Sequence, residues 1–369
     1  MRVLWIYGTS CVGKSSAAWE LYSSAETDDR RVGYVDIDQL GMCYPAPEED
    51  PERDLVKAAA LHGLIRSLSS VYVGLLIVSG IMDPRYLAEY EGLDGVAFIF
   101  VRLTLEHAEL AERCRVRWGA QEMVDAIITD ARYLETHGLE HPVIDTTGLT
   151  VPEVADAVRV AAGLASPTPP GLALGSPEPA PLSGQVLLLC GPTPVGKSTI
   201  GFQVASVLWQ SGVRSGYIDI AQLDFLLAPL SGVERAEQRA ANLLAVWRAL
   251  NAAGARRLVV SGPFETPDDL EACRAALAGC HVTVCRLEAD GAALRDRLAA
   301  RSLPGGPNLA GDELLGLDAD AREAVLLRSL AEGEAWKGWD AGVVVDTSAH
   351  DTGPTLVNVL KAAGWMPTS

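Results

Sequence analysis

The chain has 369 residues, of which 49% are hydrophobic and 21% charged, and 48 acidic side chains against 30 basic ones give a net charge of −18. A domain usually takes about 100–200 residues, so we expect two domains, or three at most, with ample apolar material for folded cores. The acidity argues against a nucleic-acid partner, which needs a basic surface, but not against phosphates bound by backbone amides.

No apolar run reaches the roughly 18–20 residues that span a bilayer, so no membrane partner is expected. The first residues, MRVLWIYGTS, indicate a core strand followed by a glycine loop and not a signal peptide. The seven cysteines are odd in number and scattered without metal-ligand spacing. We therefore expect reduced thiols in a cytoplasmic protein.

The chain contains an internal repeat. VLWIYGTSCVGKSS from Val3 matches VLLLCGPTPVGKST from Val186, and GYVDIDQL from Gly33 matches GYIDIAQL from Gly216 at the same offset of 183. Three further segments match in the same order: LLIVSG with RLVVSG, FVRLTLEHAELAERCRVR with VCRLEADGAALRDRLAAR, and VIDTTGLTVPEVADAVRVAAG with VVDTSAHDTGPTLVNVLKAAG. These ordered matches indicate a tandem duplication with a longer second copy.

Between the copies lies ASPTPPGLALGSPEPAPLSG, residues 165–184, with six prolines and almost no charge. Such a composition disfavours a helix and is typical of a semi-extended linker. We therefore expect an N-terminal domain over residues 1–164 and a C-terminal domain over residues 185–369.

In the first copy, short β-branched apolar runs predict strands at residues 2–7, 32–36, 74–79, 96–101 and 142–145. Amphipathic stretches such as LVKAAALHGLIRSL lie between them. This alternation predicts an α/β fold with a parallel sheet covered on both faces by helices. In such folds ligands bind at the carboxyl ends of the strands.

Two segments fit the phosphate-loop pattern G-x-x-x-x-G-K-[ST], GTSCVGKS from Gly8 and GPTPVGKS from Gly191, each between a strand and a helical stretch. The glycines let backbone amides surround an anion, and the helix start adds a favourable dipole. Each loop lysine is expected at the β/γ-phosphates and each following serine at Mg²⁺. The predicted nucleotide-binding residues are Gly8, Cys11, Val12, Gly13, Lys14, Ser15 and Ser16 in the first copy, and Gly191, Val195, Gly196, Lys197, Ser198 and Thr199 in the second.

Neither an N-K-x-D guanine signature nor an apolar run ending in D-E is present, and each copy is short. With the phosphate loops, this pattern resembles the shikimate-kinase and gluconate-kinase branch of the nucleoside-monophosphate-kinase-like P-loop kinases, and more loosely chloramphenicol phosphotransferase. The resemblance spans nearly the whole of each copy. It implies two doubly wound domains, each a five-stranded parallel sheet of order 2-3-1-4-5. It also implies transfer of the γ-phosphoryl group of ATP, with Mg²⁺, to a hydroxyl of a small metabolite, although GTP is not excluded.

In this family an Asp-x-Asp follows the second strand, as Asp36-Ile-Asp38 does here. The resemblance implies that Asp36 supports Mg²⁺, usually through water, and that Asp38 is the acceptor base, because phosphoryl transfer needs a metal and an orienting carboxylate. The second copy has Asp219-Ile-Ala221, which keeps the metal carboxylate and lacks the base. Asp224 could substitute only if the chain turns back there. We expect catalysis to centre on the N-terminal copy; two active sites of different specificity are the alternative.

Arg113 and Arg117 lie four residues apart on one face of a predicted helix and match Arg297 and Arg301 of the second copy. In the resembling family, arginines here belong to the helix and lid that close over ATP and stabilise charge on the transferred phosphoryl group. We expect Arg113 and Arg117 to act in this way, and Arg297 and Arg301 to bind nucleotide in the second copy. A solvated basic helix face is the alternative.

The segment between the second and third strands is where this family builds its acceptor site. Arg53 and Lys57 align with Arg235 and Arg239, so each copy keeps two cations at helical spacing, which suit an anionic acceptor group or pair with nearby carboxylates. Gly80 ends the third strand, where the missing side chain would allow close approach of a substrate. The predicted substrate residues are Asp38, Arg53, Lys57 and Gly80. The sequence identifies neither the acceptor nor the oligomeric state.

The missing base of the second copy also fits another hypothesis. The chain would then be a nucleotide-binding regulatory protein with weak ATPase activity, recognised by a protein partner. This hypothesis predicts slow hydrolysis that no small molecule changes. A nucleic-acid end kinase is opposed by the net charge of −18.

Overall fold

The computed structural model describes residues 1–25, 31–137, 139–164, 173–175, 182–264, 266–303, 311–339, 342–349 and 351–366. Two compact units are present: unit 1 comprises Met1–Gly41, Asp54–Pro177 and Phe225–Pro229, and unit 2 comprises Met42–Arg53, Glu178–Asp224 and Leu230–Ser369. Most of the expected linker, residues 165–184, lies outside the described residues. Within the described ranges, no helix combines the length and the apolar character needed to cross a bilayer.

Unit 1 is built on a six-stranded sheet in the order β6-β5-β1-β4-β2-β9. Its strands are β1 (Arg2–Tyr7), β2 (Val32–Asp36), β4 (Leu75–Gly80), β5 (Ala97–Thr104), β6 (Val143–Asp145) and β9 (Leu226–Leu227). The first five pair in parallel and, numbered along the first copy, follow the order 2-3-1-4-5. The α/β class and the strand order expected from the sequence are therefore confirmed.

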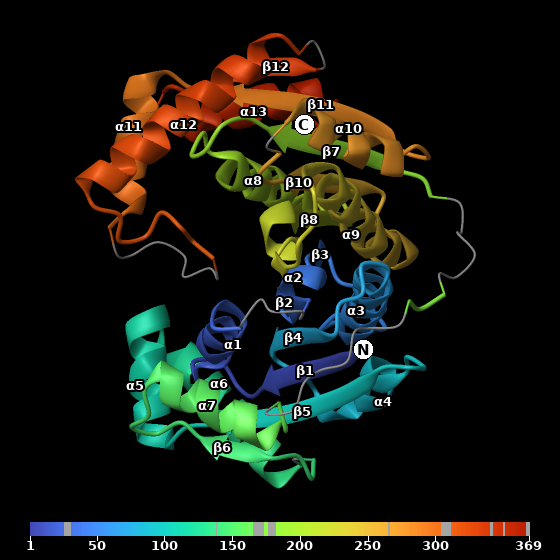
Figure 1. Cartoon of the computed structure of the whole chain (residues 1–369), viewed down its shortest axis with the longest axis vertical. Helices are drawn as coiled ribbons and strands as arrows, with labels where there is room; N and C mark the ends of the chain where they lie inside the picture. Colours follow the sequence, from blue (N-terminus) through green and yellow to red (C-terminus); the bar gives the residue numbers. More distant parts are fainter. Residues whose placement is uncertain are drawn as a thin grey trace. The chain divides into compact units, whose positions relative to one another are not determined.

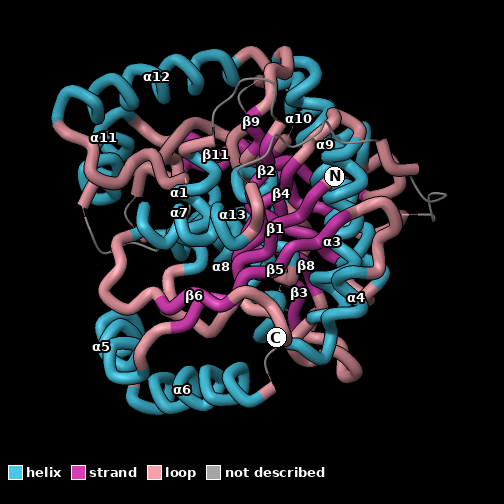
Figure 2. The backbone as a smooth tube through the Cα atoms, turned by 60° about the horizontal axis from the view of Figure 1, so that its bottom comes forward, coloured by secondary structure: helices cyan, strands magenta, loops and turns pink. Residues whose placement is uncertain are grey.

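Helices cover both faces of this sheet (Figure 1). On one face α1 (Lys14–Ser23) packs with α7 (Val151–Ala161), and on the other α3 (Asp54–Ser69) packs with α4 (Leu87–Glu91), as Figure 2 also shows. The remaining helical segments of unit 1 are α2 (Ile37–Leu40), η1 (Pro84–Tyr86), α5 (His107–Trp118) and α6 (Gln121–Thr136), of which α5 and α6 pack against each other.

Unit 2 repeats the architecture with the strand order β12-β11-β7-β10-β8-β3. Its strands are β7 (Gln185–Cys190), β8 (Ser215–Asp219), β10 (Arg257–Ser261), β11 (His281–Glu288), β12 (Val343–Asp346) and β3 (Cys43–Tyr44). Its helices are α8 (Lys197–Gln210), η2 (Ile220–Leu223), α9 (Gly232–Ala252), α10 (Pro267–Ala276), α11 (Gly291–Arg301), α12 (Ala319–Lys337) and α13 (Thr352–Ala362). Five strands again pair in parallel in the order 2-3-1-4-5.

Burial explains why the central strands are apolar almost throughout. Residues 3–7 of β1 and 187–190 of β7 are completely buried. Because helices cover both faces of each sheet, side chains on either side of a strand are removed from water. Each large apolar side chain buried in this way contributes about 1.5–3 kcal/mol to folding. The cores therefore hold the strands firmly, and the strands in turn position the polar residues at their carboxyl ends.

Each sheet carries a sixth, antiparallel strand of two residues that the sequence did not indicate, so the sheets are not five-stranded as expected. Beside β9, the backbone N–H of Tyr34 donates to the Phe225 carbonyl oxygen at 3.0 Å. The Phe225 ring contacts Trp19, Tyr22 and Tyr34 at centroid distances of 5.0, 6.2 and 5.7 Å. Residues 225–229 lie in the second sequence repeat yet belong to unit 1, and residues 42–53 of the first repeat belong to unit 2.

Candidate active site

The first phosphate loop joins β1 to α1 in unit 1. Gly13 caps α1 with a φ of 96°, a left-handed conformation that glycine adopts without strain. Lys14 follows as a buried residue whose Nζ donates to the Thr9 carbonyl oxygen at 2.6 Å. Burial lowers the pKa of Lys14 to about 8. The nearby carboxylates of Asp38 and Asp36 oppose this lowering, and a bound anion would also favour the charged form of the lysine.

Ser15 and Asp36 meet beside this loop. The Oγ atoms of Ser15 and of Ser79, near the end of β4, donate to Asp36 Oδ2 at 3.1 and 3.2 Å. The backbone N–H of Asp38 donates to the other carboxylate oxygen at 3.0 Å. Burial raises the pKa of Asp36, and the charge of Asp38 adds to the effect, so a bound cation would favour the ionised form. A hydroxyl and a carboxylate are oxygen donors that suit Mg²⁺, so these residues fit the metal.

Asp38 faces a lysine of α3. Its Oδ1 lies 3.2 Å from Lys57 Nζ, and the Lys57 side chain is 8% exposed whereas that of Asp38 is 54% exposed. Burial lowers the pKa of Lys14, and the negative charge of Asp38 is the largest charge effect that opposes this lowering. Asp38 is therefore an accessible carboxylate near two lysines, a position from which it can accept a proton from a substrate hydroxyl.

Two predicted substrate residues have surroundings that the sequence did not show. Arg53 precedes α3 at the end of a turn and has a φ of 62°, so it does not share a helical face with Lys57, and the expected helical spacing is wrong. It belongs to unit 2, where its guanidinium lies 4.2 Å from the Tyr44 ring centroid. At Gly80, which has a φ of 136°, a Cβ would lie 2.3 Å from Cγ2 of Ile37. Ile37 therefore fills the space on the side where Gly80 lacks a side chain, and close approach of a substrate to Gly80 stays a prediction.

The two arginines of α5 have different surroundings. Arg113 forms an ion pair with Glu109, one turn earlier on the same helix, at 2.6 Å. Arg117 stacks over the Trp118 ring at 4.9 Å. Burial lowers the pKa of Lys14, and the charge of Arg117 lowers it further, which places Arg117 within electrostatic reach of the phosphate loop. Arg117 therefore has an electrostatic effect on the loop lysine, whereas Arg113 pairs with a carboxylate of its own helix.

Unit 2 repeats the phosphate loop between β7 and α8. Lys197 is buried, and its Nζ donates to the carbonyl oxygens of Gly191 and Pro192 at 2.7 and 3.0 Å. Burial lowers the pKa of Lys197 to about 8. Ser198 Oγ donates to Asp219 Oδ2 at 2.6 Å, which reproduces the serine–aspartate pair of unit 1. The remaining predicted nucleotide-binding residues lie in the same loops or in the first turns of the helices that follow: Gly8, Cys11 and Ser16 in unit 1, and Gly196 and Thr199 in unit 2.

The position of the predicted base differs in unit 2. Ala221 replaces the aspartate. Asp224, which could substitute only if the chain turned back there, accepts hydrogen bonds from Nε and Nη2 of Arg239 at 3.1 and 2.6 Å. Arg239 also lies 3.4 Å from Asp269. Since the Arg239 side chain is 3% exposed and that of Asp224 is 14% exposed, Asp224 neutralises a buried cation.

The arginines of α11 also differ from each other. Arg297 donates to the Val195 carbonyl oxygen of the phosphate loop and to Thr347 Oγ1, both at 2.9 Å. Arg297 therefore supports the loop backbone. Arg301 pairs with Asp312 at 2.9 Å. Burial lowers the pKa of Lys197, and the positive charge of Arg301 lowers it further. Arg117 has the same effect on Lys14 in unit 1.

Sequence reasoning missed two supporting residues of each unit. In unit 1, Tyr34 Oη lies 3.0 Å from Ser79 Oγ and so orients the hydroxyl that contacts Asp36. Thr146 Oγ1 donates to the Val12 carbonyl oxygen at 3.2 Å and holds the phosphate loop. Tyr217 and Thr347 make the same contacts in unit 2, at 2.8 Å to Ser261 and 3.0 Å to Val195. Their presence in both copies of the repeat was the signal that could have identified them.

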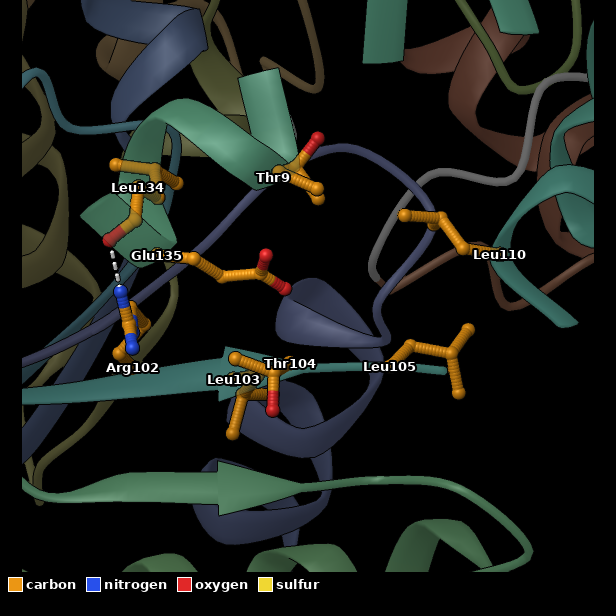
Figure 3. Close-up of a pocket in the computed structure, with 9 residues that line it drawn as sticks. Thr9, Arg102, Leu103, Thr104, Leu105, Leu110, Leu134 and Glu135 are labelled. Carbon is orange, nitrogen blue, oxygen red and sulfur yellow. Dashed lines mark hydrogen bonds between the residues drawn. The ribbon is translucent and has the colours of Figure 1, made fainter. Parts of the chain in front are cut away.

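A small pocket lies beside the first phosphate loop, between β5 and α6 (Figure 3). Arg102 of β5 donates to the Leu134 carbonyl oxygen of α6, and Figure 3 shows the Glu135 carboxylate pointing into the space between Thr9 and β5. The cavity volume is about 10 Å³, which is about the space that one water needs. The pocket is lined by Thr9, Arg102, Leu103, Thr104, Leu105, Leu110, Ala131, Leu134 and Glu135.

No family model and no curated protein matches this sequence. Among solved structures, the tunicamycin resistance protein of Deinococcus radiodurans matches at 22% identity with a TM-score of 0.36, covering 44% of this chain and 95% of that one. A gluconokinase from Sinorhizobium meliloti matches at 17% identity with a TM-score of 0.32, covering 49% of this chain and 89% of its own. Shikimate kinase from Bacteroides thetaiotaomicron matches at 14% identity with a TM-score of 0.32, covering 48% of this chain and 94% of its own.

Two of these three proteins are named as kinases, and each of the three matches a little under half of this chain. The likeness is one of fold, with helices on both faces of a mainly parallel sheet in each unit. In both units the strand order and the glycine-capped phosphate loop between the first strand and the first helix are those expected from the sequence.

Proposed function

We propose that the chain is an ATP-dependent kinase that transfers the γ-phosphoryl group to a hydroxyl of a small molecule, with catalysis centred on the N-terminal copy. Unit 1 gathers around one loop the groups that this chemistry needs: Lys14 for the phosphates, Ser15 with Asp36 for Mg²⁺, and Asp38 for the acceptor. We also propose that the two copies arose by tandem duplication and then diverged at the acceptor base.

Each side chain has a separate task in this proposal. Mg²⁺, held by Ser15 and Asp36, would neutralise charge on the β- and γ-phosphates. The Lys14 ammonium leaves the Thr9 carbonyl and binds phosphate oxygens. Asp38 accepts the proton of the acceptor hydroxyl as its oxygen forms a bond to the γ-phosphorus, the bond from that phosphorus to the β,γ-bridging oxygen breaks, and ADP leaves. Lys57 orients the Asp38 carboxylate. Arg117 adds positive charge near the transferred group.

The Asp38–Lys57 pair carries the proposal. In unit 1 the cation is buried and its acid is about half exposed, whereas in unit 2 Arg239 is buried and the Asp224 side chain is 14% exposed. Gly41 occupies the position of Asp224 in the first copy, and a Cβ there would lie 2.7 Å from Cγ of Lys57. The two copies thus pair equivalent cations with acids at different positions. Of the two acids, Asp38 is the one that solvent and a substrate can reach.

The test is transfer of label from [γ-³²P]ATP and Mg²⁺ into a panel of small hydroxyl compounds. The panel contains sugars, hydroxy acids, nucleosides and aminoglycosides, together with gluconate, shikimate and tunicamycin. We expect a labelled product that disappears in Asp38→Asn. If no compound is labelled and none changes the rate of ATP hydrolysis, the kinase proposal fails.

Unit 2 favours a second candidate, a nucleotide-binding regulator. It keeps a loop lysine and a serine–aspartate pair, but its acid is committed to Arg239. Nucleotide bound there would act through a protein partner and not through a chemical step. Under this candidate, slow ATP hydrolysis is unaffected by every compound of the panel and persists in Asp38→Asn.

A further inference from the structure

The second phosphate loop offers fewer backbone donors than the first. Pro192 and Pro194 have no N–H, whereas Thr9 and Cys11 of the first loop each have one. The N–H of Val195 donates to the Pro192 carbonyl oxygen at 3.0 Å. Because a phosphate loop binds its anion through inward-pointing N–H groups, these features weaken the second loop as a phosphate site.

One of the remaining donors is already engaged by an acid. The N–H of Thr193 donates to Oε2 of Glu332, on α12, at 3.2 Å. The Glu332 side chain is 29% exposed, so bound phosphate could displace it into solvent. Arg328, one turn earlier on α12, lies 3.8 Å from its other oxygen, Oε1, and could hold the displaced carboxylate.

The charge of Glu332 also reaches the loop lysine. Burial lowers the pKa of Lys197, and the carboxylate of Glu332 is the largest charge effect that opposes this lowering, ahead of Asp219. A carboxylate that accepts a loop N–H and stabilises the loop ammonium makes the same kinds of contact that a phosphate makes.

We propose that Glu332 is an internal anion that occupies the second phosphate loop and sets its affinity for nucleotide. A nucleotide must displace this carboxylate before its phosphates can contact Thr193 and Lys197. The second loop is then a low-affinity site that fills at higher nucleotide concentration than the first. This inference rests on the proposed binding of nucleotide to both loops.

The counterpart of Glu332 in unit 1 is defined by the burial pattern of the two helices. The buried positions Val124, Ile127 and Leu134 of α6 correspond to Leu326, Ser329 and Trp336 of α12. In this alignment the residue equivalent to Glu332 is Asp130, whose side chain is shorter by one methylene group. The inference concerns the second loop, where the Thr193 contact and the two prolines coincide.

The experiment measures binding of MgATP to the full-length chain by isothermal titration calorimetry. A Lys14→Ala background silences the first loop, so that the second is observed alone. Glu332→Gln keeps the size of the side chain and removes its charge, and Glu332→Ala removes the competitor entirely. Glu334→Gln is the matched control, because Glu334 lies on the same helix and pairs with Lys337 at 2.5 Å.

Loss of one charge-assisted hydrogen bond from the free state is expected to tighten binding roughly tenfold in both Glu332 variants. The Glu334→Gln control should change affinity by less than about twofold. Unchanged or weaker binding in the Glu332 variants overturns the inference, as does absence of binding in all of them.

A parallel titration of Lys197→Ala, with Lys14 intact, reports nucleotide binding at the first loop. If that variant binds MgATP while the Glu332 variants show no gain, the inference alone fails. If Lys197→Ala binds no MgATP, the first loop binds no nucleotide and the proposed kinase function fails. Circular dichroism melts of all variants confirm that each chain is folded.

Discussion

Lys57 Nζ lies 3.2 Å from Asp38 Oδ1, and this ion pair joins a buried cation to an accessible acid. The cation cannot remain charged in the core without a partner, because burying an unpaired charge is costly. The acid lies in the first turn of α2, directly after β2, and its side chain stays 54% exposed. The proposed base therefore also has a structural task, and experiments must separate the two.

Asp38→Asn should lower turnover by about 10²–10⁴, the usual scale for loss of a general base. Affinity for MgATP should remain nearly unchanged. The free energy of unfolding should fall by about 1 kcal/mol, since Lys57 loses its charged partner while the site stays partly solvated. Steady-state kinetics, calorimetry and urea unfolding measure the three effects.

The double variant Asp38→Asn/Lys57→Met separates the two tasks of Asp38. It removes the buried charge together with its partner, so stability should return toward that of the native chain. Turnover should remain low. Recovery of turnover in the double variant would show that Asp38 acts solely as the partner of Lys57.

Asp224→Ala should destabilise unit 2 without affecting phosphoryl transfer. It removes two hydrogen bonds to the buried Arg239 and leaves Asp269 beside it, so the loss should cost about 1–3 kcal/mol. Hydrogen exchange with mass spectrometry should show faster exchange in α9 and η2. A loss of turnover at a temperature where the variant is fully folded would assign Asp224 a role in the reaction.

Arg117→Ala should reduce turnover far more than Arg113→Ala. Arg117 acts electrostatically on Lys14, whereas Arg113 forms an exposed ion pair with Glu109 of its own helix. Loss of a charge that stabilises the transferred phosphoryl group costs roughly tenfold or more, and loss of an exposed ion pair changes little. Equal effects of the two substitutions on kcat would contradict this distinction.

Binding of MgATP to the first loop should weaken as pH rises above about 8. Burial lowers the pKa of Lys14 to about 8 in the free protein, so above that pH the ammonium that attracts phosphate is lost. Bound phosphate stabilises the ammonium, and the protein should take up a proton on binding at pH 8.5. Calorimetry of the Lys197→Ala variant in two buffers of different ionisation enthalpy measures this uptake. Its persistence after Lys14→Ala would assign the proton to another group.

Phe225→Ala should destabilise unit 1, although Phe225 lies in the second sequence repeat. Its ring packs against Trp19, Tyr22 and Tyr34. Removing a partly buried aromatic ring of this kind costs roughly 1–3 kcal/mol. Hydrogen exchange in β2 reports the loss, and Phe202→Ala, at an exposed position of α8, is the control.

The parts of the fold that short sequence patterns determine were predictable. The apolar runs located the parallel strands, because a strand covered on both faces is hydrophobic throughout. The phosphate loops were predictable because their glycines and lysine occupy fixed positions between a strand and a helix. Both Ser15 and Asp36 were expected at Mg²⁺, Ser15 from the phosphate-loop pattern and Asp36 from the family resemblance, and their side chains are in contact.

Other features depend on contacts between residues distant in sequence. The strands β3 and β9 have two residues each, too few to show a period, and their partners are in the other sequence repeat. The spacing of Arg53 and Lys57 predicted that both lie on one helix, but α3 begins at Asp54 and Arg53 ends the turn before it. The sequence does not show that Ile37 fills the space beside Gly80.

Single-turnover transfer of label from [γ-³²P]ATP to the acceptor found in the panel, compared between Lys14→Ala and Lys197→Ala, tests the central claim most directly. Catalysis centred on the N-terminal copy predicts that Lys14→Ala abolishes the labelled product, whereas Lys197→Ala retains it within about threefold of the native rate. Loss of the product in Lys197→Ala, with transfer intact in Lys14→Ala, would place the chemistry in unit 2 and contradict the account.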